Sequence, residues 1–156
     1  MTIRITRAVA PDDVAAAREL FLEYASALGV DLRFQGFEAE VAGLPGCYAP
    51  PEGRLLLARA DGELAGCAAL RPLQPTMAEM KRLYVRPELR GAAVGRSLAD
   101  AIIADARSIG YRSIRLDTLP SMGAARRLYQ SLGFREIEPY TANPIPGTAF
   151  LELDLG

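Results

Sequence analysis

The chain has 156 residues, which is enough for one domain with a sizeable hydrophobic core. Half of the residues are hydrophobic and 24% are charged, and no apolar stretch approaches the roughly 20 residues that cross a bilayer. Histidine is absent, which excludes histidine-based metal sites, Ser-His-Asp triads and imidazole acid–base catalysis. We therefore expect a single domain over residues 1–156, without a membrane partner, in which other groups transfer protons.

The charged residues are distributed unevenly, although the net charge is only −1. Residues 81–135 carry 11 of the 18 basic side chains and four of the 19 acidic ones, a local net charge of +7. This asymmetry indicates an anionic ligand for the basic stretch. Nucleic acid is disfavoured as that ligand, because few aromatic residues and no recognition motif accompany the arginines.

Cys47 and Cys67 lack the C-x-x-C spacing of redox and metal sites, and the N-terminus lacks the apolar region of a signal peptide. These features predict a cytoplasmic protein with two reduced, partly buried thiols and no bound metal. A disulfide between the two cysteines stays open as the alternative.

The first half of the chain combines strand-like alternation with one long helical pattern. Prolines and glycines interrupt residues 43–53, where we expect a loop without regular structure. Asp61-Gly62 is a hairpin signal between two apolar runs. The predicted elements are a strand at residues 2–8, a helix from Pro11 to Gly29, a shorter helix at about 34–42, and strands at 55–58 and 64–70.

The next predicted strand, residues 77–85, does not alternate regularly. Its apolar residues include Ala78, Met80, Leu83 and Val85. These four share one face only if the register shifts by one residue near Lys81-Arg82. A β-bulge produces such a shift, and bulges often lie beside active sites, so we predict a bulge here.

The second half alternates strands with helices, which is typical of an α/β sheet covered by helices. A turn of small residues at 90–97 opens a helix that ends at Gly110. The elements that follow are a strand at 113–117, a helix at about 121–132, a strand after Gly133, a proline-rich loop and a strand at 148–154. The turn itself could hold phosphate, because its small residues expose backbone N–H groups at a helix N-terminus. A plain tight turn would have the same pattern.

Two motifs in this half resemble those of the GCN5-related N-acetyltransferases. The family's phosphate-binding signature, Q/R-x-x-G-x-G/A after a strand, is similar to residues 90–95, in which Ala93 replaces the middle glycine. Residues 125–134 resemble the family motif A-x-x-L-Y-x-x-x-G-F. Met122 departs from the pattern, since many members have Asn seven residues before the motif tyrosine. Two motifs in the right order are more specific than either alone.

The resemblance implies an α/β fold in one domain, with a mixed, mostly antiparallel sheet of six to seven strands flanked by about four helices. The central strands would splay around acetyl-CoA, which would be the co-substrate. It implies cofactor contacts at Leu83, Tyr84, Val85, Arg90, Gly91, Ala92, Ala93, Val94, Gly95, Arg96, Ser97 and Tyr129. Arg90 and Arg96 would be the main side-chain contacts to phosphate.

The resemblance also implies catalytic roles for two residues. Tyr129 matches the tyrosine near the CoA sulfur and would protonate the thiolate, although a half-buried core tyrosine is the alternative. Glu79 would remove the amine proton, and its alternatives are an exposed glutamate or one paired with Lys81 or Arg82. The backbone N–H near Leu83 would stabilise the oxyanion.

The acceptor is expected to be a primary amine of a small molecule or peptide. The family pocket implies contacts from Phe34 and Tyr140, and Arg71 at a strand end could hold a substrate carboxylate. The sequence is also compatible with a homodimer. A catalytically weak domain that binds or senses CoA is the alternative function, because Ala93 and Met122 depart from the family pattern.

Overall fold

The computed structural model describes residues 1–29, 31–32, 36–91 and 93–156. Seven strands form one sheet in the order β1-β2-β3-β4-β5-β7-β6. The strands are β1 (Ile3–Arg7), β2 (Arg54–Ala60), β3 (Glu63–Gln74), β4 (Met77–Val85), β5 (Ser113–Thr118), β6 (Arg135–Ile137) and β7 (Ala149–Asp154). The helices are α1 (Pro11–Leu28), α2 (Phe37–Ala42), α3 (Val94–Ile109) and α4 (Gly123–Ser131).

All neighbouring strands are antiparallel except β4 and β5, which are parallel. A mixed, mostly antiparallel sheet with four helices in the described residues confirms the expected fold class.

Two differences from the predicted element boundaries are informative. Residues 43–53 are not wholly irregular, because a short 3₁₀ helix spans Gly46–Tyr48 and buries Tyr48. β3 continues to Gln74, four residues beyond its predicted end, because its final residues pair with the start of β4. In both places, tertiary contacts stabilise structure that local sequence signals do not predict.

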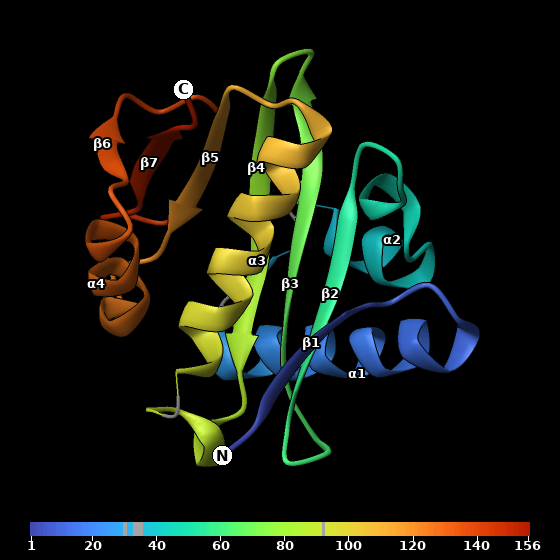
Figure 1. Ribbon diagram of the computed structural model, residues 1–156. Coiled ribbons are helices and arrows are strands. Elements are labelled where there is room, and N and C mark those ends of the chain that lie inside the picture. Colours follow the sequence, from blue (N-terminus) through green and yellow to red (C-terminus); the bar gives the residue numbers. More distant parts are fainter. Residues whose placement is uncertain (30, 33–35, 92) are drawn as a thin grey trace.

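The helices cover the two faces of the sheet differently, as Figure 1 shows with α3 in front of the sheet and α1 behind it. The α3 face packs Leu98 and Ile102 of α3 against strand residues such as Leu70 and Ile114. The α1 face packs α1 and α2 against β2 and β3. We use the names α3 face and α1 face for these two sides.

The predicted bulge is present in β4. The β3–β4 register shifts between Cys67 and Ala69, and Arg82 on β4 adopts φ = 61°. As a result, Ala78, Met80, Leu83 and Val85 all contact the core of the α3 face, whereas Tyr84 belongs to the core of the α1 face. Close packing beside the bulge requires a glycine in β3, since a Cβ on Gly66 would lie 2.3 Å from the Tyr84 carbonyl oxygen.

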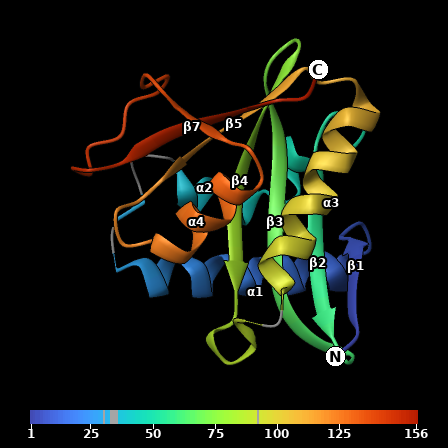
Figure 2. The same ribbon diagram turned by 60° about the vertical axis from the view of Figure 1, so that its left-hand side comes forward.

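The two parallel strands separate soon after they meet. β4 pairs with β5 only from Met77 to Glu79, opposite residues 113–115. Beyond Glu79, β4 keeps its β3 partner, while β5 continues alongside β7. The turned view in Figure 2 shows β5 leaving β4 and running beside β7. Residues 80–83 and 117–119 therefore lie on opposite sides of a gap in the sheet.

Candidate active site

The predicted phosphate-binding turn connects β4 to α3. Gly91 has φ = 84° and Ala93 has φ = 64°, so both residues adopt the left-handed conformation. For alanine, this conformation costs about 1 kcal/mol. Ala93 caps α3, and the backbone N–H groups of residues 94–96 have no intrahelical partners, whereas the Ser97 N–H donates to the Ala93 carbonyl at 3.0 Å. Ala92, another predicted contact, lies outside the described residues.

The side chains at this turn comprise exposed cations and a buried apolar residue. The Arg90 side chain is exposed, and its Nε donates to the Val85 carbonyl at 3.1 Å. Arg96 is half exposed and donates to Ser131 Oγ on α4 at 3.3 Å. Val94 is buried, so it can offer a ligand only its backbone. The described residues of the predicted phosphate-binding turn thus place two arginine side chains at the N-terminus of α3.

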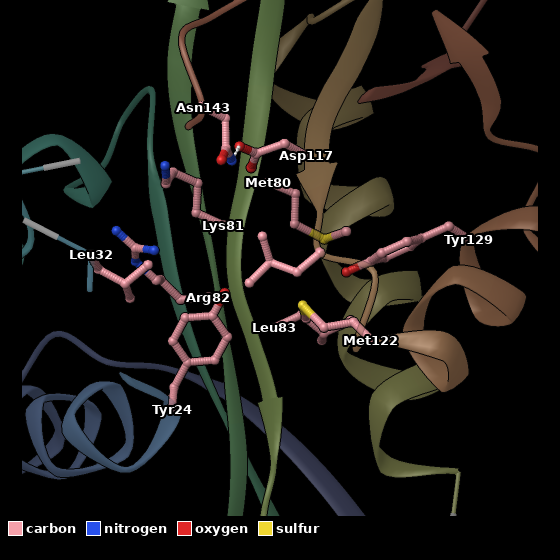
Figure 3. Close-up of a pocket in the computed structure, with 11 residues that line it drawn as sticks. Tyr24, Leu32, Met80, Lys81, Arg82, Leu83, Asp117, Met122, Tyr129 and Asn143 are labelled. Atoms are coloured by element: carbon pink, nitrogen blue, oxygen red, sulfur yellow. Dashed lines mark hydrogen bonds between the residues drawn. The ribbon is translucent and has the colours of Figure 1, made fainter. Parts of the chain in front are cut away.

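A cavity of about 30 Å³ occupies the gap between β4 and β5. Its lining comprises Tyr24 of α1, Leu32, Met80–Leu83 of β4, Asp117 and Leu119, Met122 and Tyr129 at α4, and Asn143 of the late loop. Figure 3 shows these side chains on both sides of β4. The cavity volume is near that of one water molecule, and the flexible side chains of Met80 and Met122 in its lining can adjust to a ligand.

Tyr129 places its hydroxyl in this cavity. The side chain is 4% exposed, it packs against Phe134 with ring centroids 5.5 Å apart, and its hydroxyl bonds to no described residue. Burial raises the pKa of the phenol above its ordinary value of 10.0, and the nearby tyrosine and carboxylate charges act in the same direction. Tyr129 therefore remains protonated at neutral pH and can donate a proton.

The other predicted cofactor residues of β4 point in different directions. Leu83 lines the gap, next to Tyr129 in Figure 3. The Tyr84 side chain instead points to the α1 face, where its hydroxyl donates to Glu23 Oε1 at 3.3 Å. Only the backbone of Tyr84 is therefore available to a ligand in the gap.

Three residues that the sequence assigned to catalysis and acceptor binding form one network. Glu79 is 2% exposed; its Oε1 accepts from Arg71 at 2.7 Å and its Oε2 accepts from the Tyr140 hydroxyl at 2.6 Å. Glu79 thus pairs with Arg71 rather than with Lys81 or Arg82, and it is absent from the cavity lining. Phe34, the remaining acceptor prediction, lies outside the described residues.

The bulge residue Arg82 is held from the α1 face, a contact that sequence reasoning missed. Its guanidinium donates to both carboxylate oxygens of Glu40 at 2.8 and 2.9 Å and lies over the rings of Phe37 and Tyr24. The Cys67 thiol donates to the Arg82 carbonyl oxygen at 3.3 Å. These contacts stabilise a backbone conformation that is costly for arginine. An irregular apolar pattern was the only sequence signal for this arrangement.

Asp117, which sequence reasoning did not select as a site residue, also lines the cavity, together with Asn143 of the late loop. The Asn143 amide donates to Asp117 Oδ2 at 3.0 Å, as the dashed line in Figure 3 marks. Lys81 is a further lining residue, and burial lowers the pKa of its amine. An acidic residue at the end of the strand before α4 was the available signal for Asp117.

Comparisons with known proteins agree with the fold and the motifs. The model of the acetyltransferase (GNAT) family matches residues 15–134. An uncharacterized N-acetyltransferase of Schizosaccharomyces pombe, C1271.07c, is 42% identical over 155 residues, which cover 98% of this chain and 95% of that protein. The structure of a GNAT acetyltransferase from Staphylococcus aureus Mu50 has a TM-score of 0.81 at 21% identity, covering 99% of this chain and 100% of that one.

A second solved structure contains the cofactor. The protein yncA of Salmonella typhimurium, solved with its cofactor acetyl-CoA, has a TM-score of 0.70 at 21% identity and covers all of this chain and 95% of its own. The chain belongs to the GNAT acetyltransferase family. It is an N-acetyltransferase that depends on acetyl-CoA.

The described residues were also searched for membrane-spanning helices, metal-ligand clusters and paired cysteines. Within them, no helix combines the length and apolarity needed to cross a membrane, and no three His, Cys, Asp or Glu side chains gather as metal ligands. Both cysteines are free: Cys47 is exposed and Cys67 is buried. The partial burial predicted for both thiols is therefore wrong.

Proposed function

We propose that the chain transfers the acetyl group of acetyl-CoA by direct attack of a primary amine, carried by a small molecule or a peptide. The observation that carries this proposal is the Tyr129 hydroxyl, which lies in the gap between β4 and β5 without a partner among the described residues. The properties of the two cysteine thiols support direct attack rather than an acetyl-cysteine intermediate. Burial raises the pKa of Cys67, and Cys47 is absent from the cavity lining, so neither is suited to carry the acetyl group.

The turn at residues 90–97 fits the phosphates of CoA. It combines unpartnered N–H groups at the start of α3 with the exposed guanidinium of Arg90 and the half-exposed one of Arg96. Charge-assisted hydrogen bonds from arginine suit both the pyrophosphate and the 3′-phosphate. The open edge of β4 at Leu83–Val85 would then hold the pantetheine arm, with the thioester near Tyr129.

Stabilisation of the oxyanion and protonation of the leaving sulfur can then each be assigned to a group in the gap. The Leu83 N–H beside the bulge would stabilise the oxyanion, and Tyr129 would give its proton to the departing sulfur. The assignment of Glu79 as base stays a prediction. Arg71 and Tyr140 occupy its two carboxylate oxygens, so this role would require one of these contacts to open.

The test combines ligand binding with turnover. We expect acetyl-CoA at 100 times its Kd to stabilise the folded protein by about 2.7 kcal/mol, measured as a rise in Tm. Thiol release is then assayed with a panel of amino acids, aliphatic diamines, arylalkylamines and peptides. Protection without thiol release from any amine would favour the CoA-sensing alternative, and loss of both effects would contradict acetyl-CoA use.

Variants of two buried tyrosines test the donor. Tyr129→Phe should lower kcat about 100-fold while acetyl-CoA protection persists, because only proton donation is lost. Tyr111→Phe is the matched control, since the Tyr111 hydroxyl donates to the Glu52 carbonyl away from the gap. An unchanged kcat for Tyr129→Phe would refute the donor role.

A further inference from the structure

Asp117 differs from the other carboxylates near the active site in its partners. Glu40, Glu79 and Glu152 each accept from an arginine, at 2.8, 2.7 and 2.8 Å. Asp117 makes no ion pair with any described residue, and its one hydrogen-bond donor is the neutral amide of Asn143. Of these four carboxylates, Asp117 is thus the one that lines the cavity and the one that makes no ion pair with a described residue.

Two structural features fix the orientation of the Asp117 side chain. Ile114 and Leu116 on β5 belong to the core of the α3 face, so the alternation of the strand directs Asp117 to the α1 face. There, the Asn143 amide occupies Oδ2, and its own carbonyl oxygen accepts from the Ile145 N–H at 3.0 Å, which fixes the amide orientation. Oδ1 accepts no hydrogen bond from a described residue and is available to a ligand.

The cavity places this carboxylate among polar groups from four elements. The titratable groups that interact with the Asp117 charge are Lys81 on β4, Tyr24 on α1, Tyr129 on α4 and Tyr140 on the late loop. Burial raises the pKa of each tyrosine, so all three stay neutral, and Lys81 is the only cation among the four. A cationic ligand in the gap would therefore meet Asp117 beside a neutral Tyr129.

We propose that Asp117 binds the ammonium form of the acceptor and takes its proton, which makes the substrate class a basic primary alkylamine. This inference rests on the proposed acetyl transfer. Asp117 accepts one proton from R–NH₃⁺ and passes it to water, and the neutral nitrogen forms the C–N bond. The C–S bond then breaks, Tyr129 protonates the sulfur, and the second nitrogen proton restores Tyr129. The products are the amide, free CoA and one proton.

The experiment compares a protonated acceptor with a neutral one. The alkylamine on which the wild-type protein is fastest is almost entirely ammonium at neutral pH, whereas hydroxylamine is largely neutral and small enough to enter the same pocket. Asp117→Asn should lower kcat/KM for the alkylamine about 100-fold and for hydroxylamine less than about threefold, because a neutral nucleophile needs no base. Raising the pH toward the pKa of the alkylamine should restore most of the lost rate.

Three further variants separate the explanations. Asn143→Leu should lower kcat/KM severalfold for the alkylamine alone, because Asn143 positions Asp117. Glu79→Gln tests the rival base: if it abolishes alkylamine turnover selectively and Asp117→Asn does not, the assignment to Asp117 is overturned. Glu136→Gln removes an exposed carboxylate on β6 and is the neutral control.

The remaining outcomes are equally decisive. An equal loss with both nucleophiles would make Asp117 a structural residue, and no loss with either would exclude it from the reaction. Persistent acetyl-CoA protection shows that Asp117→Asn is folded. If the wild-type protein acetylates no amine, the proposed function fails together with this inference, whereas amine turnover that is indifferent to Asp117 contradicts this inference alone.

Discussion

The α3 face and the α1 face of the sheet differ in how they use side chains. The core of the α3 face is assembled from aliphatic and aromatic residues of α3 and five strands. The α1 face has a smaller apolar core under α1 and α2, and beside it lie ion pairs such as Arg82–Glu40, Arg71–Glu79 and Arg115–Glu152. β4, β5 and β7 therefore bury apolar residues on the α3 face and contribute charged residues to the α1 face, whereas β2 and β3 bury apolar residues on both.

Because of this difference, the α3 face mainly stabilises the fold, whereas the charged residues of the α1 face orient polar groups around the cavity. Apolar burial on the α3 face supplies most of the hydrophobic driving force and positions α3 against the sheet. The ion pairs on the α1 face contribute less stability, since desolvation of the charges offsets their attraction, but they fix the orientation of polar groups around the cavity. Variants on the two faces should consequently fail in different ways.

The largest expected effect is on the α3 face. Leu98→Ala removes a fully buried side chain and should lower the free energy of unfolding by about 3 kcal/mol, measured by urea denaturation. Ser108→Ala, at an exposed position of the same helix, should change it by less than about 0.5 kcal/mol. A loss below about 1 kcal/mol for Leu98→Ala would contradict the assignment of the main core to this face.

A smaller loss is expected when one ion pair on the α1 face is broken. Arg71→Met leaves the 2% exposed Glu79 without its cation and should cost about 2 kcal/mol, discounted because Arg71 is 36% exposed. Adding Glu79→Gln should restore part of this stability, since no buried charge then remains. Arg4→Met, an exposed arginine on β1, is the control. An identical loss in the single and double variants would refute the pairing argument.

Substitution by glycine should have opposite effects on stability at the start and in the middle of α3. Ala93→Gly should stabilise the fold by about 1 kcal/mol, because glycine adopts φ = 64° without strain. Ala104→Gly, in the exposed helix interior, should destabilise it by about 1 kcal/mol. Calorimetric Tm values of the two variants should therefore move in opposite directions. A decrease in both would show that Ala93 is unstrained.

The smallest effect concerns pH and the ion pair between Glu23 of α1 and Arg86, the residue that follows β4. The hydrogen bond from Arg86 holds the pKa of Glu23 below its ordinary value of 4.5. A lowered folded-state pKa contributes stability at pH above 4.5 that is lost as the pH falls through the folded-state value. Glu23→Gln should remove this part of the acid dependence, by at most about 1 kcal/mol for so exposed a pair.

Urea midpoints measured from neutral to acidic pH test this expectation. Glu63→Gln removes an exposed carboxylate that makes no ion pair with a described residue, and it serves as the control. Parallel acid profiles for the wild-type protein and Glu23→Gln would contradict a stabilising Glu23–Arg86 pair.

The sequence by itself determined the features that depend on local order. The broken alternation at residues 77–85 was sufficient to predict the bulge, because side chains point to alternate faces of any strand. Small residues before a helix were sufficient to predict the turn that precedes α3, and the tyrosine motif singled out Tyr129. These features depend on neighbours in the chain, and the fold class followed from them through the family resemblance.

Only the tertiary structure decided how the charged residues are partnered. Glu79 meets Tyr140 across 61 positions of sequence, and Asp117 meets Asn143 across 26. A sequence does not show how the surroundings of two carboxylates differ. The sequence analysis therefore selected Glu79 as the base and did not select Asp117. Strand register, the separation of β4 from β5 and the path of the late loop leave Asp117 facing the cavity and enclose Glu79. Charge pairing depends on distance and burial, and the folded chain alone sets both.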